Sequence, residues 1–284
     1  MVGAYRPDSF AQALLIRREN RVIPFAGGTD LMVKHRRHSG LAPQFDRPIL
    51  LLGHLEELRA VDVSGDDLTV GAAVTLAELA THGEAPEALK QAVSEIASPA
   101  LRNVATLAGN VCNASPAGDT LPVLYCLDAA LVLANVSGER RVPIDQFVVA
   151  PGRTTLREDE LVKSIVIPRT TFDVVYYRKV GTRRANALAK LSFLGVAAVE
   201  GNIVRDLRIA FGAVAPTVVR ARELERELTG RSKFDVAQRS QALVEAYSEL
   251  IVPIDDQRST AHYRKAICLR LLEQFLAEIS RDAA

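Results

Sequence analysis

The pattern of strand-like segments changes after Pro168, and this change limits the folds that the chain can adopt. Before it, short apolar runs typical of strands alternate with amphipathic stretches. These runs lie at residues 22–25, 49–52, 68–73, 129–134 and 161–167. After it come three longer strand-like runs, at residues 174–180, 191–200 and 203–214. Gly201-Asn202 between the last two is typical of a hairpin turn. Mixed βα units before an antiparallel sheet predict an α/β domain of about 170 residues, then a smaller α+β domain.

Helices are expected between and after these strands. Asp8 or Ser9 is a candidate N-cap for a helix through about Arg18, and residues 75–78 have the form of a capping box. Further helices are expected at residues 29–38, 87–97, 221–228 and 234–250, and a last one begins at Ser259. Apolar side chains recur every four residues in that last helix: Tyr263, Ile267, Leu271, Phe275 and Ile279. The segment 101–119, rich in Gly, Asn, Ser and Pro, is interpreted as an ordered loop.

Composition and charge exclude several classes of protein. The chain has 284 residues, which suggests two domains or one large one. A net charge of +1 gives no general attraction to nucleic acid or to an anionic membrane. No apolar run approaches the roughly 20 residues that span a bilayer. The first ten residues lack the features of a signal peptide, so a cytoplasmic protein is expected.

Metal-ligand motifs are missing from the sequence. Cys112, Cys126 and Cys268 form no CxxC pair, and the five histidines form no HExxH pattern. No iron–sulfur cluster or zinc site is therefore expected within the chain. Redox chemistry would have to come from an organic cofactor or from another chain.

Two segments carry residue types suited to a polar ligand. In Phe25–Leu31 a strand ends in Gly27-Gly28 and a helix follows, so that backbone N–H groups and the helix dipole could meet a pyrophosphate. A plain loop would look the same, and neither GxGxxG nor a P-loop is present. The second segment, 106–119, gathers Thr, Asn, Ser and Gly, and ends in Asp119, which could accept hydrogen bonds from sugar or ribityl hydroxyls. A turn system that satisfies its own hydrogen bonds is the alternative.

Together these segments resemble a known family. AGGTDL at 26–31, the stretch 101–122 and LDAALVL at 127–133 are similar to the flavoprotein (medium) subunit of bacterial molybdenum hydroxylases, the xanthine dehydrogenase and carbon monoxide dehydrogenase family. The resemblance covers nearly the whole chain, and continues at residues 159–162, 177–179, 208–213 and 263–265. One departure is Ala108, where the family usually has glycine in a TxGGN pattern.

The resemblance implies a fold. It is an α+β, two-subdomain FAD-binding fold of the vanillyl-alcohol oxidase and murein-reductase type, followed by a smaller α+β C-terminal domain. Residues 1–170 would form the FAD-binding domain, with a subdomain boundary near residue 55, and residues 171–284 the C-terminal domain.

The resemblance also implies the residues that bind FAD. The first segment would lie along the pyrophosphate, the second would form a further phosphate and flavin loop, Asp119 would meet hydroxyls, Leu161 the flavin edge and Lys179 the ring. The complete set is Ile23, Pro24, Phe25, Ala26, Gly27, Gly28, Thr29, Asp30, Leu31, Thr106, Leu107, Ala108, Gly109, Asn110, Asn113, Asp119, Leu161 and Lys179. No residue of this chain is expected to be catalytic or to bind a metal.

In function, the resemblance implies an electron-transfer subunit. A small iron–sulfur subunit with two [2Fe–2S] clusters and a large subunit with the molybdenum cofactor would be its partners. FAD would collect electrons from the clusters and pass them to NAD⁺ or another acceptor. A self-contained flavin oxidoreductase and a flavin-free scaffold are the alternatives. The organic substrate, the acceptor and the stoichiometry stay open.

Three further features have two interpretations each. The basic run 34–38 is a solvated face, or it meets a partner subunit or the adenylate end of the cofactor. Cys112 is a structural thiol or a redox thiol near the flavin. Arg183-Arg184 anchors a loop or steers the phosphates of NAD.

Overall fold

The computed structural model describes residues 3–183 and 186–281. Contacts within the chain divide it into two compact units, each of which is assembled from separated segments. Unit 1 comprises Met1–Ala85, Ser98–Ala114 and Asp128–Arg169. Unit 2 comprises Pro86–Ala97, Ser115–Leu127 and Thr170–Ala284. Segments 86–97 and 115–127 therefore belong to unit 2, although the residues before and after each of them belong to unit 1.

Unit 1 contains a small parallel sheet with the strand order β1-β3-β2. Its strands are β1 (Ala4–Tyr5), β2 (Ile23–Phe25) and β3 (Ile49–Leu51). Leu50 in the central strand is fully buried. The strands predicted at 22–25 and 49–52 are confirmed, each one residue shorter than expected.

A second, antiparallel sheet of unit 1 has the order β4-β5-β10-β6-β7. Its strands are β4 (Val61–Ser64), β5 (Asp67–Gly71), β6 (Ala130–Asn135), β7 (Gly138–Pro143) and β10 (Leu161–Pro168). The three inner strands are apolar and were predicted. The two edge strands were not, because β4 and β7 are polar and largely exposed, so that no apolar run marks them. A short pair, β8 (Val148–Ala150) and β9 (Arg153–Thr154), completes the strands of this unit.

Two helices of unit 1 begin at N-cap side chains that the sequence predicted. Ser9 Oγ accepts a hydrogen bond from Gln12 N at the start of α1 (Phe10–Glu19), and Thr75 forms the predicted capping box with Glu78 at α3 (Leu76–Thr81). The remaining helices of this unit are short: α2 (Thr29–Lys34), the 3₁₀ helix η1 (Glu56–Leu58), α5 (Pro99–Arg102), α6 (Leu107–Cys112) and α8 (Ile144–Phe147).

Two predictions in unit 1 were wrong in detail. The helix predicted over 29–38 ends at Lys34, because the chain turns away there: the carbonyl of His35 accepts from Gln44 N at 2.8 Å, and the His35 ring lies 4.5 Å from that of Phe45. The segment 101–119 is not a loop throughout, since it contains the last turn of α5 and all of α6. Thr106 caps α6 by accepting from Gly109 N, so a residue type that suggested a turn begins a helix instead.

Unit 2 is built around the antiparallel sheet β11-β12-β13. Its strands are β11 (Val174–Val180), β12 (Leu191–Glu200) and β13 (Ile203–Gly212), with Gly201-Asn202 at the predicted hairpin. The unit also holds α4 (Glu87–Ser94), α7 (Thr120–Cys126), α9 (Arg222–Leu228), α10 (Lys233–Leu250) and α11 (Ala261–Ser280). Helices α4 and α7 come from the two inserted segments.

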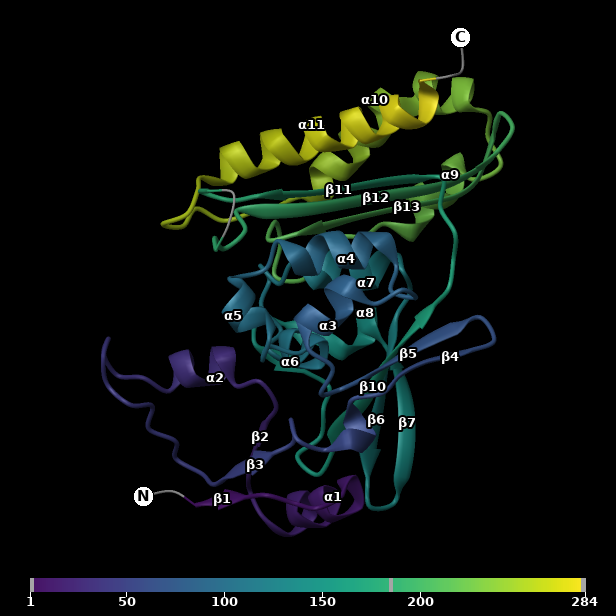
Figure 1. Cartoon of the computed structure of the whole chain (residues 1–284). Helices are drawn as coiled ribbons and strands as arrows, with labels where there is room; N and C mark the ends of the chain where they lie inside the picture. Colours follow the sequence, from purple (N-terminus) through teal and green to yellow (C-terminus); the bar gives the residue numbers. More distant parts are fainter. Residues whose placement is uncertain (1–2, 184–185, 282–284) are drawn as a thin grey trace. The chain divides into compact units, whose positions relative to one another are not determined.

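The sheet of unit 2 lies between two helical layers (Figure 1). Helices α10 and α11 cover one face, where Phe193 and Phe211 of the sheet pack with Phe275 and Tyr247. Helices α4 and α7 cover the other face, where Pro122 lies against Gly212. The first seven residues of β12 are all buried, as expected for a central strand covered on both sides.

The last helix departs from its predicted periodicity at its start. It begins at Ala261 with Thr260 as N-cap, and not at Ser259. Leu271, Phe275 and Ile279 are buried as predicted, but Tyr263 is 40% exposed and lies beneath the ammonium of Lys190.

Three residues other than glycine adopt positive φ where the chain passes from one unit to the other. They are Ala97 (φ 50°), Ala114 (φ 48°) and Asp128 (φ 53°). Side chains disfavour this conformation, so the surrounding structure must hold it in place. Within the described residues, no helix combines the length and apolarity needed to cross a membrane.

Candidate functional site

The first glycine segment makes a tight turn in unit 1, between β2 and α2. A Cβ atom on Gly27 would lie 1.8 Å from the carbonyl oxygen of Val104, so the two backbones touch. Gly28 has φ 67° and is the N-cap of α2, and it provides no side chain to cap that helix. Only glycine fits at these two positions, and the turn is followed directly by the start of α2, which no side chain caps.

The second segment directly follows Val104 and Ala105, whose backbone lies against Gly27 of the first segment. Thr106 makes an antiparallel bridge to Thr75, and Leu76 N donates to the carbonyl of Ala105 at 2.8 Å. A Cβ on Gly109 would lie 2.9 Å from Thr106 Oγ1, the atom that caps α6. Ala108 is buried within α6, so the helix accommodates the methyl group by which the chain departs from the family pattern.

A side-chain contact also links the two segments. The ammonium of Lys34, the first residue of the basic run, donates a hydrogen bond to Asn113 Oδ1 at the end of α6. Cys112 precedes Asn113 and is partly buried, and burial raises the pKa of its thiol to about 12. A thiol with so high a pKa is a weak nucleophile, which favours the structural interpretation of Cys112.

The unit 1 candidates differ in accessibility. Asp30 and Gly109 are exposed, and nine candidates are half-buried residues: Pro24, Phe25, Ala26, Gly27, Gly28, Thr29, Leu31, Asn110 and Asn113. Five candidates are buried by the protein itself: Ile23, Thr106, Leu107, Ala108 and Leu161. Leu161 begins the central strand β10, where it pairs with Ala134.

The remaining two candidates, Asp119 and Lys179, form an ion pair in unit 2. Lys179 Nζ lies 2.7 Å from Asp119 Oδ2, and the two side chains are 7% and 8% exposed. Lys179 Nζ also donates to the carbonyl of Glu95, at the end of α4, at 2.8 Å. Asp119 occupies the N-cap position of α7 but makes no capping hydrogen bond, because its carboxylate turns to Lys179.

The environment of this pair makes the Asp119 carboxyl harder to ionise than a free aspartate. Burial raises the pKa of Asp119 to about 6 and outweighs the attraction of Lys179, which lowers it. Asp119 Oδ1 is buried without a hydrogen-bond partner among the described residues. An unsatisfied buried acceptor is costly, so this oxygen is suited to a hydroxyl donor from a ligand.

Tyr177 lies on the same face of β11 as Lys179, two residues earlier; it belongs to the run 177–179 of the resemblance, which gave it no role. It is buried, its hydroxyl has no partner among the described residues, and burial together with the charge of Asp119 raises its pKa. Tyr176, on the opposite face, donates to Gln274 Oε1 at 2.8 Å. Side chains alternate between the two faces of a strand, so the spacing of two residues between Tyr177 and Lys179 is the sequence signal that places them on the same face.

The structure thus sorts the predicted residues into two groups. Residues 23–31, residues 106–113 and Leu161 belong to unit 1, where contacts join the first two segments. Asp119 and Lys179 belong to unit 2 and contact each other. Arg183 donates to the carbonyl of Asn186, in keeping with a loop anchor, and Arg184 lies outside the described residues. No group of three or more His, Cys, Asp or Glu side chains in the described part of the chain is arranged for a metal ion.

Two sequence families match the chain. Residues 1–170 match the family described as the FAD binding domain in molybdopterin dehydrogenase. Residues 176–279 match the family described as the CO dehydrogenase flavoprotein C-terminal domain.

Relatives of known name match over nearly the whole length of both chains. The xanthine dehydrogenase FAD-binding subunit of Escherichia coli O157:H7 is 28% identical over 282 residues, covering 96% of this chain and 94% of the relative. The glyceraldehyde dehydrogenase medium chain of Sulfolobus acidocaldarius is 28% identical over 281 residues, covering 97% of each.

Solved structures share the fold. A chain of the carbon monoxide dehydrogenase from Hydrogenophaga pseudoflava superposes with a TM-score of 0.87 at 24% identity, covering 96% of this chain and 95% of that one. A chain of quinoline 2-oxidoreductase from Pseudomonas putida 86 gives a TM-score of 0.85 at 20% identity, covering 100% and 98%. At these identities the likeness concerns the fold.

Proposed function

Because the chain belongs to the family of FAD-binding domains of molybdopterin dehydrogenases, we propose that it is the FAD-binding, electron-transferring subunit of a molybdenum hydroxylase. The observation that carries the proposal is the family match over residues 1–170, continued by the flavoprotein match over residues 176–279. In this proposal the chain holds FAD and passes electrons, and the organic substrate is oxidised on a partner subunit.

The turn 23–31 is proposed to lie along the pyrophosphate of FAD. Gly27 and Gly28 permit the tight turn that leads into α2, and the dipole at the start of that helix favours negative charge. Thr106, residues 107–110 of α6 and Asn113 are proposed as the adjoining segment that binds the phosphate and the flavin. The backbone contact between Gly27 and Val104 supports this, because it holds both segments together in one unit.

The pair in unit 2 is proposed to bind the sugar-like part and the ring of the cofactor. Asp119 Oδ1, which lacks a partner, would accept from a ribityl or ribose hydroxyl. Lys179, held by Asp119 and the carbonyl of Glu95, would approach the ring or its carbonyl, and Leu161 would touch the flavin edge. These three side chains bind and orient the cofactor, and none has to transfer a proton in the reaction.

The partners in this proposal are a small iron–sulfur subunit with two [2Fe–2S] clusters and a large molybdenum-cofactor subunit. When bound, FAD supplies a group that exchanges either one or two electrons, and thus connects the clusters to NAD⁺ or another acceptor. Support comes from the relatives, which are named as an FAD-binding subunit and a medium chain.

We further propose that residues 1–170 form the FAD-binding domain, with a subdomain boundary near residue 55, and residues 171–284 the C-terminal domain. The limits of the two family matches support the division near residue 170. The passage from the β1-β3-β2 sheet to the β4-β5-β10-β6-β7 sheet after Leu51 supports the inner boundary.

An absorption spectrum of the purified full chain tests the function, with the cofactor then released and identified. We expect flavin bands and FAD at about one per chain. A folded, colourless chain that refuses added FAD would overturn the proposal in favour of a flavin-free scaffold. Oxidation of a small organic substrate by the chain alone would favour a self-contained flavin oxidoreductase.

A further inference from the structure

Helix α7 is a short buried element whose position in unit 2 is fixed at both ends. All seven of its residues, Thr120–Cys126, are buried. Its main chain spans about 10 Å at the usual rise of an α-helix. Asp119 stands at its start, paired with Lys179, and the carbonyl groups of Tyr125 and Cys126 stand at its end. Because the helix is so short, a displacement along its axis moves both of its ends together.

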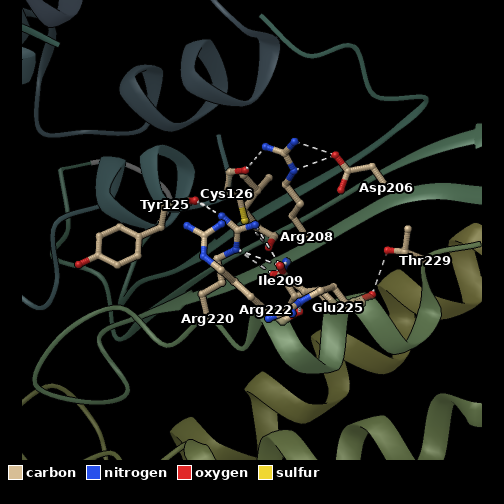
Figure 2. A network of polar contacts seen from close by, with 11 residues as sticks. Tyr125, Cys126, Asp206, Arg208, Ile209, Arg220, Arg222, Glu225 and Thr229 are labelled. Atoms are coloured by element: carbon tan, nitrogen blue, oxygen red, sulfur yellow. Dashed lines mark hydrogen bonds and ion pairs between the residues drawn. The ribbon is translucent and has the colours of Figure 1, made fainter. Parts of the chain in front are cut away.

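Arg220 holds the end of α7 at the carbonyl of Tyr125 (Figure 2). Its guanidinium is in turn held by Glu225 on α9: Nε lies 2.9 Å from Oε1, and Nη2 lies 3.0 Å from Oε2. Both side chains are 5% exposed. The forked geometry fixes the plane of the guanidinium, so that Nη1 points at the helix end.

Glu225 ties this arrangement to the sheet. Its Oε1 accepts a hydrogen bond from the backbone N of Ile209 in β13 at 2.7 Å. The carboxylate therefore joins α9, the central part of β13 and Arg220 in one buried network. Since a buried charge without partners is costly, each member of the network needs the others.

A second arginine holds the neighbouring carbonyl. Arg208 Nη1 donates to the carbonyl of Cys126 at 2.9 Å, and its Nη2 lies 2.7 Å from Asp206 Oδ2 (Figure 2). The last carbonyls of a helix have no partners within the helix, and positive charge there also complements the helix dipole. Arg208 is more exposed than Arg220, so Arg220 is the stronger constraint.

We propose that Arg220, oriented by Glu225, is a positioning residue for the cofactor site, because it sets the axial position of α7 and so the place of Asp119 beside Lys179. This inference rests on the proposed function of Asp119. Arg220 and Glu225 act through the helix and do not contact the cofactor. The assignment extends the functional residues of the chain to a network at the opposite end of α7.

The test uses the double variant Arg220→Met/Glu225→Gln in the full chain. It removes the hydrogen bond to Tyr125 without leaving a lone buried charge, and the glutamine oxygen keeps an acceptor for Ile209 N. FAD affinity is measured across pH 4.5–8, together with hydrogen exchange of the chain without FAD. We expect FAD binding to weaken about tenfold. The pH midpoint of FAD binding should move upward, because a displaced Asp119 lies farther from Lys179, which then lowers the pKa of Asp119 less. Amides of α7 should exchange faster.

Two comparison variants separate positioning from general stability. Arg220→Lys keeps the charge and should recover part of the affinity. Val244→Ala removes a methyl pair from the core on the α10 face, so it lowers stability without touching α7. Equal pH midpoints in the wild type and the double variant, or an equal upward shift in Val244→Ala, would overturn the inference. A wild-type chain that binds no FAD would instead overturn the proposed function, and exchange of α7 would still decide whether Arg220 positions the helix.

Discussion

The ammonium of Lys179 lies 2.7 Å from the carboxylate of Asp119, and both side chains are shielded from solvent. These residues come from different elements, a strand and the start of a helix, and are 60 positions apart in the chain. Their pairing gives unit 2 a buried charged group whose ionisation depends on pH in an accessible range.

The first prediction concerns the stability of the FAD-free chain. Burial raises the pKa of Asp119 from 3.8 to about 6, so the folded state binds this proton more tightly than the unfolded state. The corresponding stability is fully present below pH 4 and is lost as pH rises through about 6. Asp119→Asn should remove this part of the pH dependence, on the order of 2–3 kcal/mol, in urea unfolding between pH 4 and 7. An unchanged pH profile would show that Asp119 titrates normally.

The second prediction concerns the glycine turn. Gly27→Ala should destabilise the chain by about 1–3 kcal/mol and abolish FAD binding, because the new methyl group would collide with the carbonyl of Val104. Thermal unfolding and FAD titration measure the two effects. Gly53→Ala is the matched control, since its nearest neighbour would lie at 3.4 Å, and it should change neither quantity substantially. Equal behaviour of the two variants would contradict the close approach at Gly27.

The third prediction concerns the cap of α6. Thr106→Val keeps the shape of the side chain but removes the acceptor for Gly109 N, so it should cost about 1 kcal/mol of stability. FAD affinity should fall as well, because this segment is proposed to bind the cofactor. Thr106→Ser keeps the oxygen and should retain both properties. A valine variant as stable as the serine variant would exclude a role for the cap.

The fourth prediction concerns Cys112. Its pKa of about 12 leaves almost no thiolate at pH 7.5, so iodoacetamide should not modify it in the folded chain. Mass spectrometry of the digested protein locates the label, and the urea-unfolded chain provides the positive control. Rapid labelling of native Cys112 would restore the redox-thiol interpretation.

The sequence alone allowed the family and much of the secondary structure to be predicted. The resemblance based on residues 26–31 and 101–122 is confirmed by the family matches over 1–170 and 176–279. Strands were predicted correctly where most residues are buried, as in β10 and β12, because burial demands a mainly apolar sequence. The capping box at Thr75 was correct because its hydrogen bonds lie within four residues.

The tertiary structure decided what depends on distant contacts. The edge strands β4 and β7 are stabilised by pairing with neighbours, and their sequences carry no apolar signal. Whether Asp119 caps α7 or pairs with Lys179 depends on where β11 lies. The hydrogen bond from Arg220 to the carbonyl of Tyr125 depends on the relative positions of α7, α9 and β13. Caps and apolar periodicity depend on interactions between residues that are close in the sequence, so they can be predicted from it. The pairing of charged groups far apart in the chain follows from the packing of the whole unit, which excludes water and leaves each charge only the partners that the fold provides.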